Sequence, residues 1–281
     1  MRKIEVNKEK FLELFNSGLT CQQIADEMHL KYGLIEKRKR EWGLKRSNSF
    51  YKKKLFNESF FHCIDCEEKA YWLGFLFADG SVYKRGTSCI ISIKVKDKEV
   101  CDKFLKSINA NFETYSCLCK DSYHPNLKHE IYSVDLFSKE MFNDLNNYGC
   151  VPNKSLILQF PNNISKEFIP HFIRGYFDGD GCVTIGKRNN STKYNNIHIE
   201  YCGTLEFLTE LNNNLPFKGT VSKEKRRVTN TYKLSKSGTK NAKIFFKYLY
   251  TNATVYLERK YNKFLEYFTD RNINIEDVQR A

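Results

Sequence analysis

Two segments of the chain, Trp72-Leu-Gly-Phe-Leu-Phe-Ala-Asp-Gly80 and Ile173-Arg-Gly-Tyr-Phe-Asp-Gly-Asp-Gly181, are near copies of each other. Each is an apolar run with a glycine near its middle, and each closes in Asp-Gly. Their last acids, Asp79 and Asp180, lie 101 positions apart. A repeat at this distance predicts two similar half-domains, each of which presents one carboxylate from the end of a helix.

Small residues recur at four-residue spacing in both segments. Gly74 and Ala78 fall on one helix face, as do Gly175 and Gly179, so the two helices can approach closely. Packing alone would explain the small residues but not the acids. A carboxylate at a helix C-terminus is disfavoured by about 0.3–1 kcal/mol, and two carboxylates at close range add to that cost. A divalent cation would remove it, and carboxylate oxygens without nearby histidine or thiolate suit Mg²⁺.

The composition indicates an acidic partner. The 281 residues suffice for about two domain-sized units. Lys and Arg number 46 against 33 Asp and Glu, which gives a formal charge of +13 and favours nucleic acid or an acidic membrane surface. No apolar run approaches the roughly 18 residues of a membrane span, and the N-terminus lacks a signal-peptide core. We therefore expect an intracellular protein, cytoplasmic, nucleoid-associated or in an organelle, with no membrane partner.

The ten cysteines are predicted to be reduced thiols, because an aromatic-rich chain of this length can build a core without disulfides. A zinc site is the alternative, with ligands from His62, Cys63, Cys66, Cys117, Cys119, His124 and His129. The Cys-x-Cys spacing of the second pair is not the usual one for structural zinc, which disfavours this alternative.

Residues 1–46 resemble a helix-turn-helix module. Asn7 can cap a first helix, Thr20 with Gln23 forms a capping-box pair that opens a second, and a third is expected from Tyr32 to Trp42. The residues of the third helix expected to contact DNA are Lys37, Arg38, Lys39 and Arg40. The alternative is a small helical cap with a solvated basic face. Residues 47–66, polar and lysine-rich, are predicted to be a linker.

The remaining chain is predicted to form half-domains at 67–165 and 166–281. Residues 91–96 alternate apolar and polar side chains, which is typical of a half-buried strand. Each half-domain is expected to run helix, two strands, helix, two strands, helix. That order predicts an α+β protein whose antiparallel sheets carry their helices on one face.

Basic residues gather in and around the predicted strands. We expect them to line one face of the two sheets, where a sheet surface can enter the major groove of duplex DNA. A membrane-binding protein would instead be expected to carry a basic amphipathic helix. The residues are Lys84, Arg85, Lys94, Lys96, Lys120, Lys187, Arg188, Lys193, Lys223, Lys225, Arg226, Arg227 and Lys233.

The two repeated segments resemble the paired motifs of the LAGLIDADG homing endonucleases, in the single-chain form that carries both. Residues 149–155, followed by Phe160-Pro161, resemble the segment that closes the first repeat of that family, and residues 256–260 resemble the second closure. The resemblance spans residues 67 to about 270. It implies a monomer with pseudo-twofold symmetry, in which the motif helices join two saddle-shaped sheets that straddle DNA.

The resemblance also implies site residues and a reaction. Asp79 and Asp180 correspond to the metal-binding acids, Ala78 and Gly179 to the residues whose carbonyls assist them, and Lys154 and Lys260 to basic residues near the scissile phosphates. The implied reaction is metal-assisted hydrolysis of both DNA strands with short 3′ overhangs, with Mg²⁺ as cofactor and Mn²⁺ as a substitute. The lysines would stabilise the developing charge or tune the attacking water.

The first motif departs from the family pattern, since Phe77 stands where the second has Asp178. No strand residue could be matched to the polar group that positions water in the family. Two other functions stay open beside the endonuclease. One is a transcriptional regulator with an inactive nuclease fold, which the retention of both acids and both lysines disfavours. The other is a maturase that binds its host intron RNA.

Overall fold

The computed structural model describes residues 6–45, 54–120, 128–187, 195–224 and 231–280. The chain divides into two compact units, Met1–Lys54 and Leu55–Ala281. Part of the predicted linker therefore belongs to the second unit. Phe60 and Phe61 are buried in that unit's core, with 4% and 0% of their surface exposed, which explains why residues 55–66 pack with it.

The first unit is a three-helix module, as its capping residues predict. The Asn7 side chain accepts a hydrogen bond from the Lys10 amide, and Thr20 and Gln23 form the expected capping box. Phe11, Ile24 and Ile35, one from each helix, are fully buried together. The helices are α1 (Lys8–Asn16), α2 (Cys21–Glu27) and α3 (Tyr32–Glu41).

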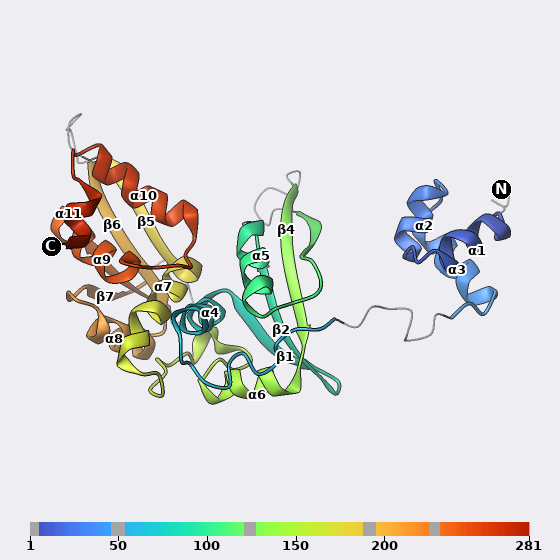
Figure 1. Cartoon of the computed structure of the whole chain (residues 1–281), viewed down its shortest axis with the longest axis horizontal. Helices are drawn as coiled ribbons and strands as arrows, with labels where there is room; N and C mark the ends of the chain where they lie inside the picture. The colour runs from blue at the N-terminus through green and yellow to red at the C-terminus, as the bar shows by residue number, and fades with distance from the viewer. Residues whose placement is uncertain (1–5, 46–53, 121–127, 188–194, 225–230, 281) are drawn as a thin grey trace. The chain divides into compact units, whose positions relative to one another are not determined.

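The second unit contains the two predicted repeats, and the α+β class is confirmed (Figure 1). The first half-domain comprises α4 (Glu67–Ala78), β1 (Gly80–Arg85), β2 (Ser88–Val95), α5 (Lys98–Ser107), β3 (Tyr115–Lys120), β4 (Lys128–Phe137) and α6 (Lys139–Asn147). The second comprises α7 (Ile169–Asp180), β5 (Gly181–Lys187), β6 (Asn195–Gly203), α8 (Leu205–Asn214), β7 (Thr220–Lys223), β8 (Tyr232–Ser237) and α9 (Thr239–Tyr250). Two helices follow the second repeat, α10 (Glu258–Thr269) and α11 (Ile275–Arg280).

Each half-domain holds a four-stranded antiparallel sheet, with strand orders β1-β2-β4-β3 and β5-β6-β8-β7. One face of each sheet packs on helices and the other is open. β2 is more buried than the alternation of residues 91–96 predicts, because Ser92 is 2% exposed between the fully buried Ile91 and Ile93, and exposure begins only at Lys94. None of the described helices is both long and apolar enough to cross a bilayer.

Helices α4 and α7 lie side by side between the two sheets (Figure 1). Glycines make this close approach possible. A Cβ atom on Gly74 would lie 2.0 Å from the Phe172 carbonyl oxygen, and one on Gly175 would lie 1.9 Å from the Tyr71 carbonyl oxygen. Both distances are far below van der Waals contact, so the backbones touch directly, as the small-residue spacing predicts.

Candidate functional site

The two motif acids lie at the same end of the α4–α7 pair. Asp79 is the C-cap of α4, and Asp180 is the last residue of α7. A Cβ atom on Gly179 would lie 2.3 Å from the Ala78 Cβ and 3.5 Å from the Asp79 Cγ. The two helix ends are therefore in contact, and both acidic side chains are exposed there.

Each acid lines its own pocket, and both half-domains contribute to each pocket. The first, which we name the Asp79 pocket, has a volume of about 310 Å³ and includes Asp79, Lys94, Lys96, Asp97, Asp178 and Arg259. The second, the Asp180 pocket, has a volume of about 250 Å³ and includes Phe77, Ala78, Ser155, Tyr176, Asp180 and Thr231. The segment that closes one repeat thus completes the pocket of the other repeat's acid.

The protein around Asp79 shifts the pKa of its carboxyl group. Although the Asp79 side chain reaches solvent, partial burial raises its carboxyl pKa, while the charges of Lys260, Lys154 and Arg259 oppose that rise. A carboxylate that is partly desolvated beside cations is suited to binding a further positive charge or a hydrogen-bond donor. Perturbed acids in a pocket are typical of functional sites.

The two motif lysines lie beneath the helix ends rather than at the surface. Lys154 is 7% exposed and donates a hydrogen bond to the carbonyl of Gly80, the residue that follows the first acid. It also lines a hollow of about 410 Å³ on the open face of the first sheet, together with Ser81 and Lys94. The lysine therefore holds the main chain next to Asp79 and reaches the open face.

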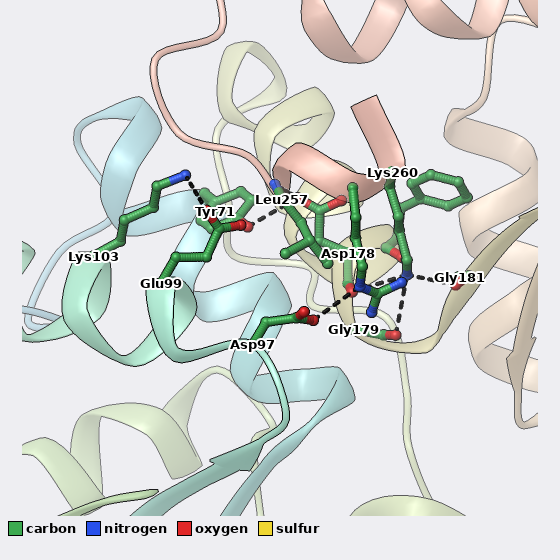
Figure 2. A network of polar contacts seen from close by, with 11 residues as sticks. Tyr71, Asp97, Glu99, Lys103, Asp178, Gly179, Gly181, Leu257 and Lys260 are labelled. Atoms are coloured by element: carbon green, nitrogen blue, oxygen red, sulfur yellow. Dashed lines mark hydrogen bonds and ion pairs between the residues drawn. The ribbon is translucent and has the colours of Figure 1, made fainter. Parts of the chain in front are cut away.

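Lys260 is held more extensively (Figure 2). It is 4% exposed, and its Nζ, which carries three N–H donors, lies within hydrogen-bond distance of four carbonyl oxygens at the end of α7, those of Phe177 at 2.5 Å, Asp178 at 2.9 Å, Gly179 at 3.2 Å and Gly181 at 2.5 Å. These include carbonyls that a helix end leaves without an internal partner. Burial lowers the pKa of Lys260 to about 8.

The sixth motif positions make different contacts in the two halves. Asp178 is 1% exposed, and its Oδ2 accepts hydrogen bonds from the Tyr71 hydroxyl at 2.9 Å and the Leu257 amide at 2.7 Å (Figure 2). Its counterpart Phe77 instead packs edge-to-face on Phe172, with ring centroids 5.1 Å apart. The polar pair Tyr71–Asp178 is thus replaced by an aromatic pair at the equivalent position.

The strand register separates the basic residues that were expected to share one face. Lys84 follows buried Val82 at a spacing of two, so it points to the helix side, where its Nζ lies 5.3 Å from the Phe142 ring centroid. Lys223 likewise shares the helix side with Val221, which packs on the core. The prediction of a single face is therefore wrong for these two lysines, because side chains alternate between the faces of a strand.

Other predicted basic residues do lie on the open faces. Their register places Arg85 and Lys94 on the open face of the first sheet and Lys233 on that of the second. Lys233 forms ion pairs with Glu200 at 2.8 Å and Glu224 at 2.7 Å. Lys96 follows β2 and lines the Asp79 pocket. The predicted contacts Arg188, Lys193, Lys225, Arg226 and Arg227, and the side chains of Lys120 and Lys187, lie outside the described part of the chain.

In the first unit, the basic residues of α3 form a partly paired surface. Arg38 and Lys37 pair with Glu41 at 2.5 Å and 3.9 Å. Lys39 pairs with Glu36 at 3.9 Å, and Arg40 is exposed. Exposed pairs within one helix are worth only about 0.3–0.5 kcal/mol, so these cations can exchange partners at little cost.

The donors present at the acids fit a magnesium ion better than zinc. Mg²⁺ is usually held by one or two carboxylates together with waters and substrate phosphates. Asp79 and Asp180 offer two exposed carboxylates at touching helix ends. Within the described ranges no three His, Cys, Asp or Glu side chains gather in a metal-binding group, which includes the cysteines considered for zinc; His124 lies outside those ranges.

Comparison with known proteins agrees with this geometry. A family profile described as a LAGLIDADG-like domain matches residues 167–250, which span most of the second half-domain. The homing endonuclease I-WcaI, solved bound to its DNA recognition sequence, superimposes with a TM-score of 0.51 over 80% of this chain and 96% of its own, at 14% identity. The chain has the LAGLIDADG fold. The first half-domain repeats the topology of the second, which explains why the likeness to I-WcaI extends over both.

Two curated relatives come from Methanocaldococcus jannaschii. One is the DNA-directed RNA polymerase subunit Rpo1C, 30% identical over 121 residues, which are 42% of this chain and 13% of the subunit. The other is the uncharacterized protein MJ0314, 28% identical over 128 residues, which are 44% of each chain. The chain thus spans less than half the length of the curated relatives it matches.

Several residues around the two acids were not predicted from the sequence. Arg259 and Asp97 meet in the Asp79 pocket, and Tyr71 binds Asp178 across the helix pair. Arg174 is fully buried and pairs with Glu67 at 2.5 Å, which ties α7 to the start of α4. The position of Arg259 beside the motif lysine Lys260 was the one available signal.

Proposed function

We propose that the protein is a site-specific endonuclease that hydrolyses both strands of a DNA duplex with the help of a divalent metal ion. The observation that carries the proposal is the contact between two parallel helix ends, which places Asp79 and Asp180 in two neighbouring pockets between two antiparallel sheets. Paired carboxylates without a complete protein ligand set are suited to a cation that also binds phosphate.

In this proposal the acids hold the metal with the carbonyls of Ala78 and Gly179, and DNA lies along the open sheet faces. A bound Mg²⁺ or Mn²⁺ ion would supply an activated water and neutralise charge at phosphorus. The chain's own contribution is to fix the helix ends. Lys154 and Lys260 do so by binding the carbonyls around the acids, and their charges favour the anionic transition state. Short 3′ overhangs are the product that the family resemblance implies.

Substitution of the acids tests the proposal. Purified protein with Mg²⁺ should cut a duplex selected from a randomised or genomic pool, whereas Asp79→Asn and Asp180→Asn should abolish double-strand cleavage and keep DNA affinity within about threefold. Asp277→Asn, an exposed acid in α11, is the matched control and should cut like the wild type.

The same selection separates the endonuclease from a regulator. Specific binding without cleavage in Mg²⁺ or Mn²⁺ would reject the endonuclease and favour the regulator. Cleavage that survives both acid substitutions would place the chemistry elsewhere in the chain.

A further inference from the structure

We infer that Arg259 is a phosphate-binding residue of the Asp79 pocket, held in place by Asp97. The inference rests on the proposed endonuclease function and adds a phosphate-binding side chain to one of its two pockets. A guanidinium group is suited to this role because its planar fork of donors matches the oxygens of a phosphate.

The position of Arg259 is set by a contact between the two half-domains. The residue lies in the first turn of α10, and its Nε donates to the Asp97 Oδ2 at 2.8 Å. Asp97 is the N-cap residue of α5 in the other half-domain, yet its side chain makes no cap hydrogen bond. Its carboxylate is therefore available to orient the arginine.

The rest of the guanidinium group remains accessible. The Arg259 side chain is 58% exposed, and in the described part of the chain its terminal nitrogens form no hydrogen bond or ion pair. Fixing Nε while leaving both terminal nitrogens open presents two parallel donors. This is the arrangement that binds two oxygens of one phosphate group.

Arg259 also acts on the motif acid. It lines the same pocket as Asp79, and its charge is among those that oppose the rise of the Asp79 carboxyl pKa. A phosphate in that pocket would therefore meet Arg259, Lys94 and Lys96 on its walls. The cations would offset the repulsion between a phosphate and the nearby carboxylates of Asp79, Asp97 and Asp178.

The first repeat carries a different residue at the position equivalent to Arg259. Lys154 and Lys260 occupy matching positions in the two repeats. The residue before Lys154 is Asn153, so Asn153 is the counterpart of Arg259. Asn153 is uncharged, adopts a left-handed backbone with φ of 56°, and lines the hollow beside Lys154 rather than the Asp180 pocket. The described residues that line the Asp180 pocket include Phe77, Tyr176 and Thr231. Arg259 should therefore act on the one strand whose phosphate enters the Asp79 pocket.

Strand-resolved kinetics test the inference. With a duplex labelled differently on each strand, Arg259→Gln should slow cutting of one strand by about 10- to 100-fold, the effect of one charged hydrogen bond, and change the other strand much less. Asp97→Asn should slow the same strand by a smaller factor. Arg259→Lys keeps the charge but loses the fork, so it should restore only part of the rate. Arg280→Gln, which changes an exposed arginine of α11, is the matched control.

A binding measurement makes the inference independent of cleavage. Without divalent metal, Arg259→Gln should lower the slope of log affinity against log salt by about 1, because one phosphate contact is lost, whereas Arg259→Lys should keep the wild-type slope. An unchanged slope and an unchanged ratio of strand rates would overturn the inference while leaving the endonuclease intact. If the wild type cuts neither strand, the endonuclease fails, and the slope alone decides whether Arg259 binds phosphate.

Discussion

The sixth motif residue of the second repeat, Asp178, is a buried acid whose ionisation is coupled to folding. Burial raises the pKa of Asp178 to about 6, above the value near 3.9 of an unfolded chain. Between pH 4 and 6 the folded chain therefore binds a proton that the unfolded chain has lost, and stability falls as pH rises through this window. The Tyr71 hydroxyl and Leu257 amide that bind Oδ2 recover only part of the cost.

Asp178→Asn should flatten this pH dependence. The amide oxygen can still accept both hydrogen bonds, and no charge is buried above pH 6. Denaturant unfolding at pH 4 to 7 should give a variant that gains up to about 3 kcal/mol on the wild type as pH rises, from two pKa units at 1.4 kcal/mol each. Asp277→Asn, an exposed acid, serves as the control. Parallel curves for wild type and Asp178→Asn would contradict the assignment.

Single residues differ in how far their roles follow from sequence. Asp79 and Asp180 could be placed at helix ends because the repeat itself fixes their offset. Arg259 and Asp97 could not be paired, because they are 162 positions apart and meet only after the half-domains dock. The contacts of Asp178 were hidden for the same reason, since Tyr71 and Leu257 come from two other elements.

Helices α4 and α7 depend on glycine for their contact, which Gly175→Ala tests at the scale of elements. The added methyl group would lie 1.9 Å from the Tyr71 carbonyl oxygen, a backbone atom that cannot move without shifting α4. We expect a loss of at least about 2 kcal/mol in the free energy of unfolding, with reduced cleavage because the helix ends move apart. Gly186→Ala in β5, where nothing lies within 4 Å, should be nearly neutral. Equal stability of the two variants would refute the close packing.

The faces of β1 and β2 give a second test at this scale. Lys94 lies on the open face, whereas Lys84 lies against Phe142 on the helix side. If DNA binds the open face, Lys94→Ala should weaken binding several-fold by fluorescence anisotropy, and Lys84→Ala, with the same loss of charge, should change it little. A larger effect for Lys84 would place the DNA elsewhere. The strands were predictable from alternation, but the face of each lysine depends on register, and a shift of one residue reverses it.

For the molecule as a whole, the internal repeat was the strongest source of prediction. The duplicated segment predicted two half-domains and the helix pair between them, and the order of strands and helices in each half predicted the antiparallel sheets. The pockets were less predictable, since each combines an acid from one repeat with residues that close the other. The boundary between the two units also differs from the predicted linker at 47–66. Phe60 and Phe61 are buried in the core of the second unit although polar residues surround them in the sequence.

The separation of the chain into two units predicts that binding and chemistry can be separated. Each unit buries its own apolar cluster, so removal of residues 1–54 should leave the unfolding midpoint of Leu55–Ala281 unchanged. DNA affinity should fall and depend less on salt, because the cations of α3 are lost. Single-turnover cleavage at saturating protein should stay near the wild-type rate, since Asp79 and Asp180 remain.

Point substitutions in the full chain control for the deletion. Lys37→Ala and Arg40→Ala remove exposed charges of α3 without shortening the protein, so they should weaken binding in the same direction. Unchanged affinity in the deletion and in both substitutions would show that α1 to α3 form a cap and not a DNA-binding module. A lowered unfolding midpoint after deletion would mean instead that the first unit stabilises the second, and any loss of cleavage would then have a structural origin.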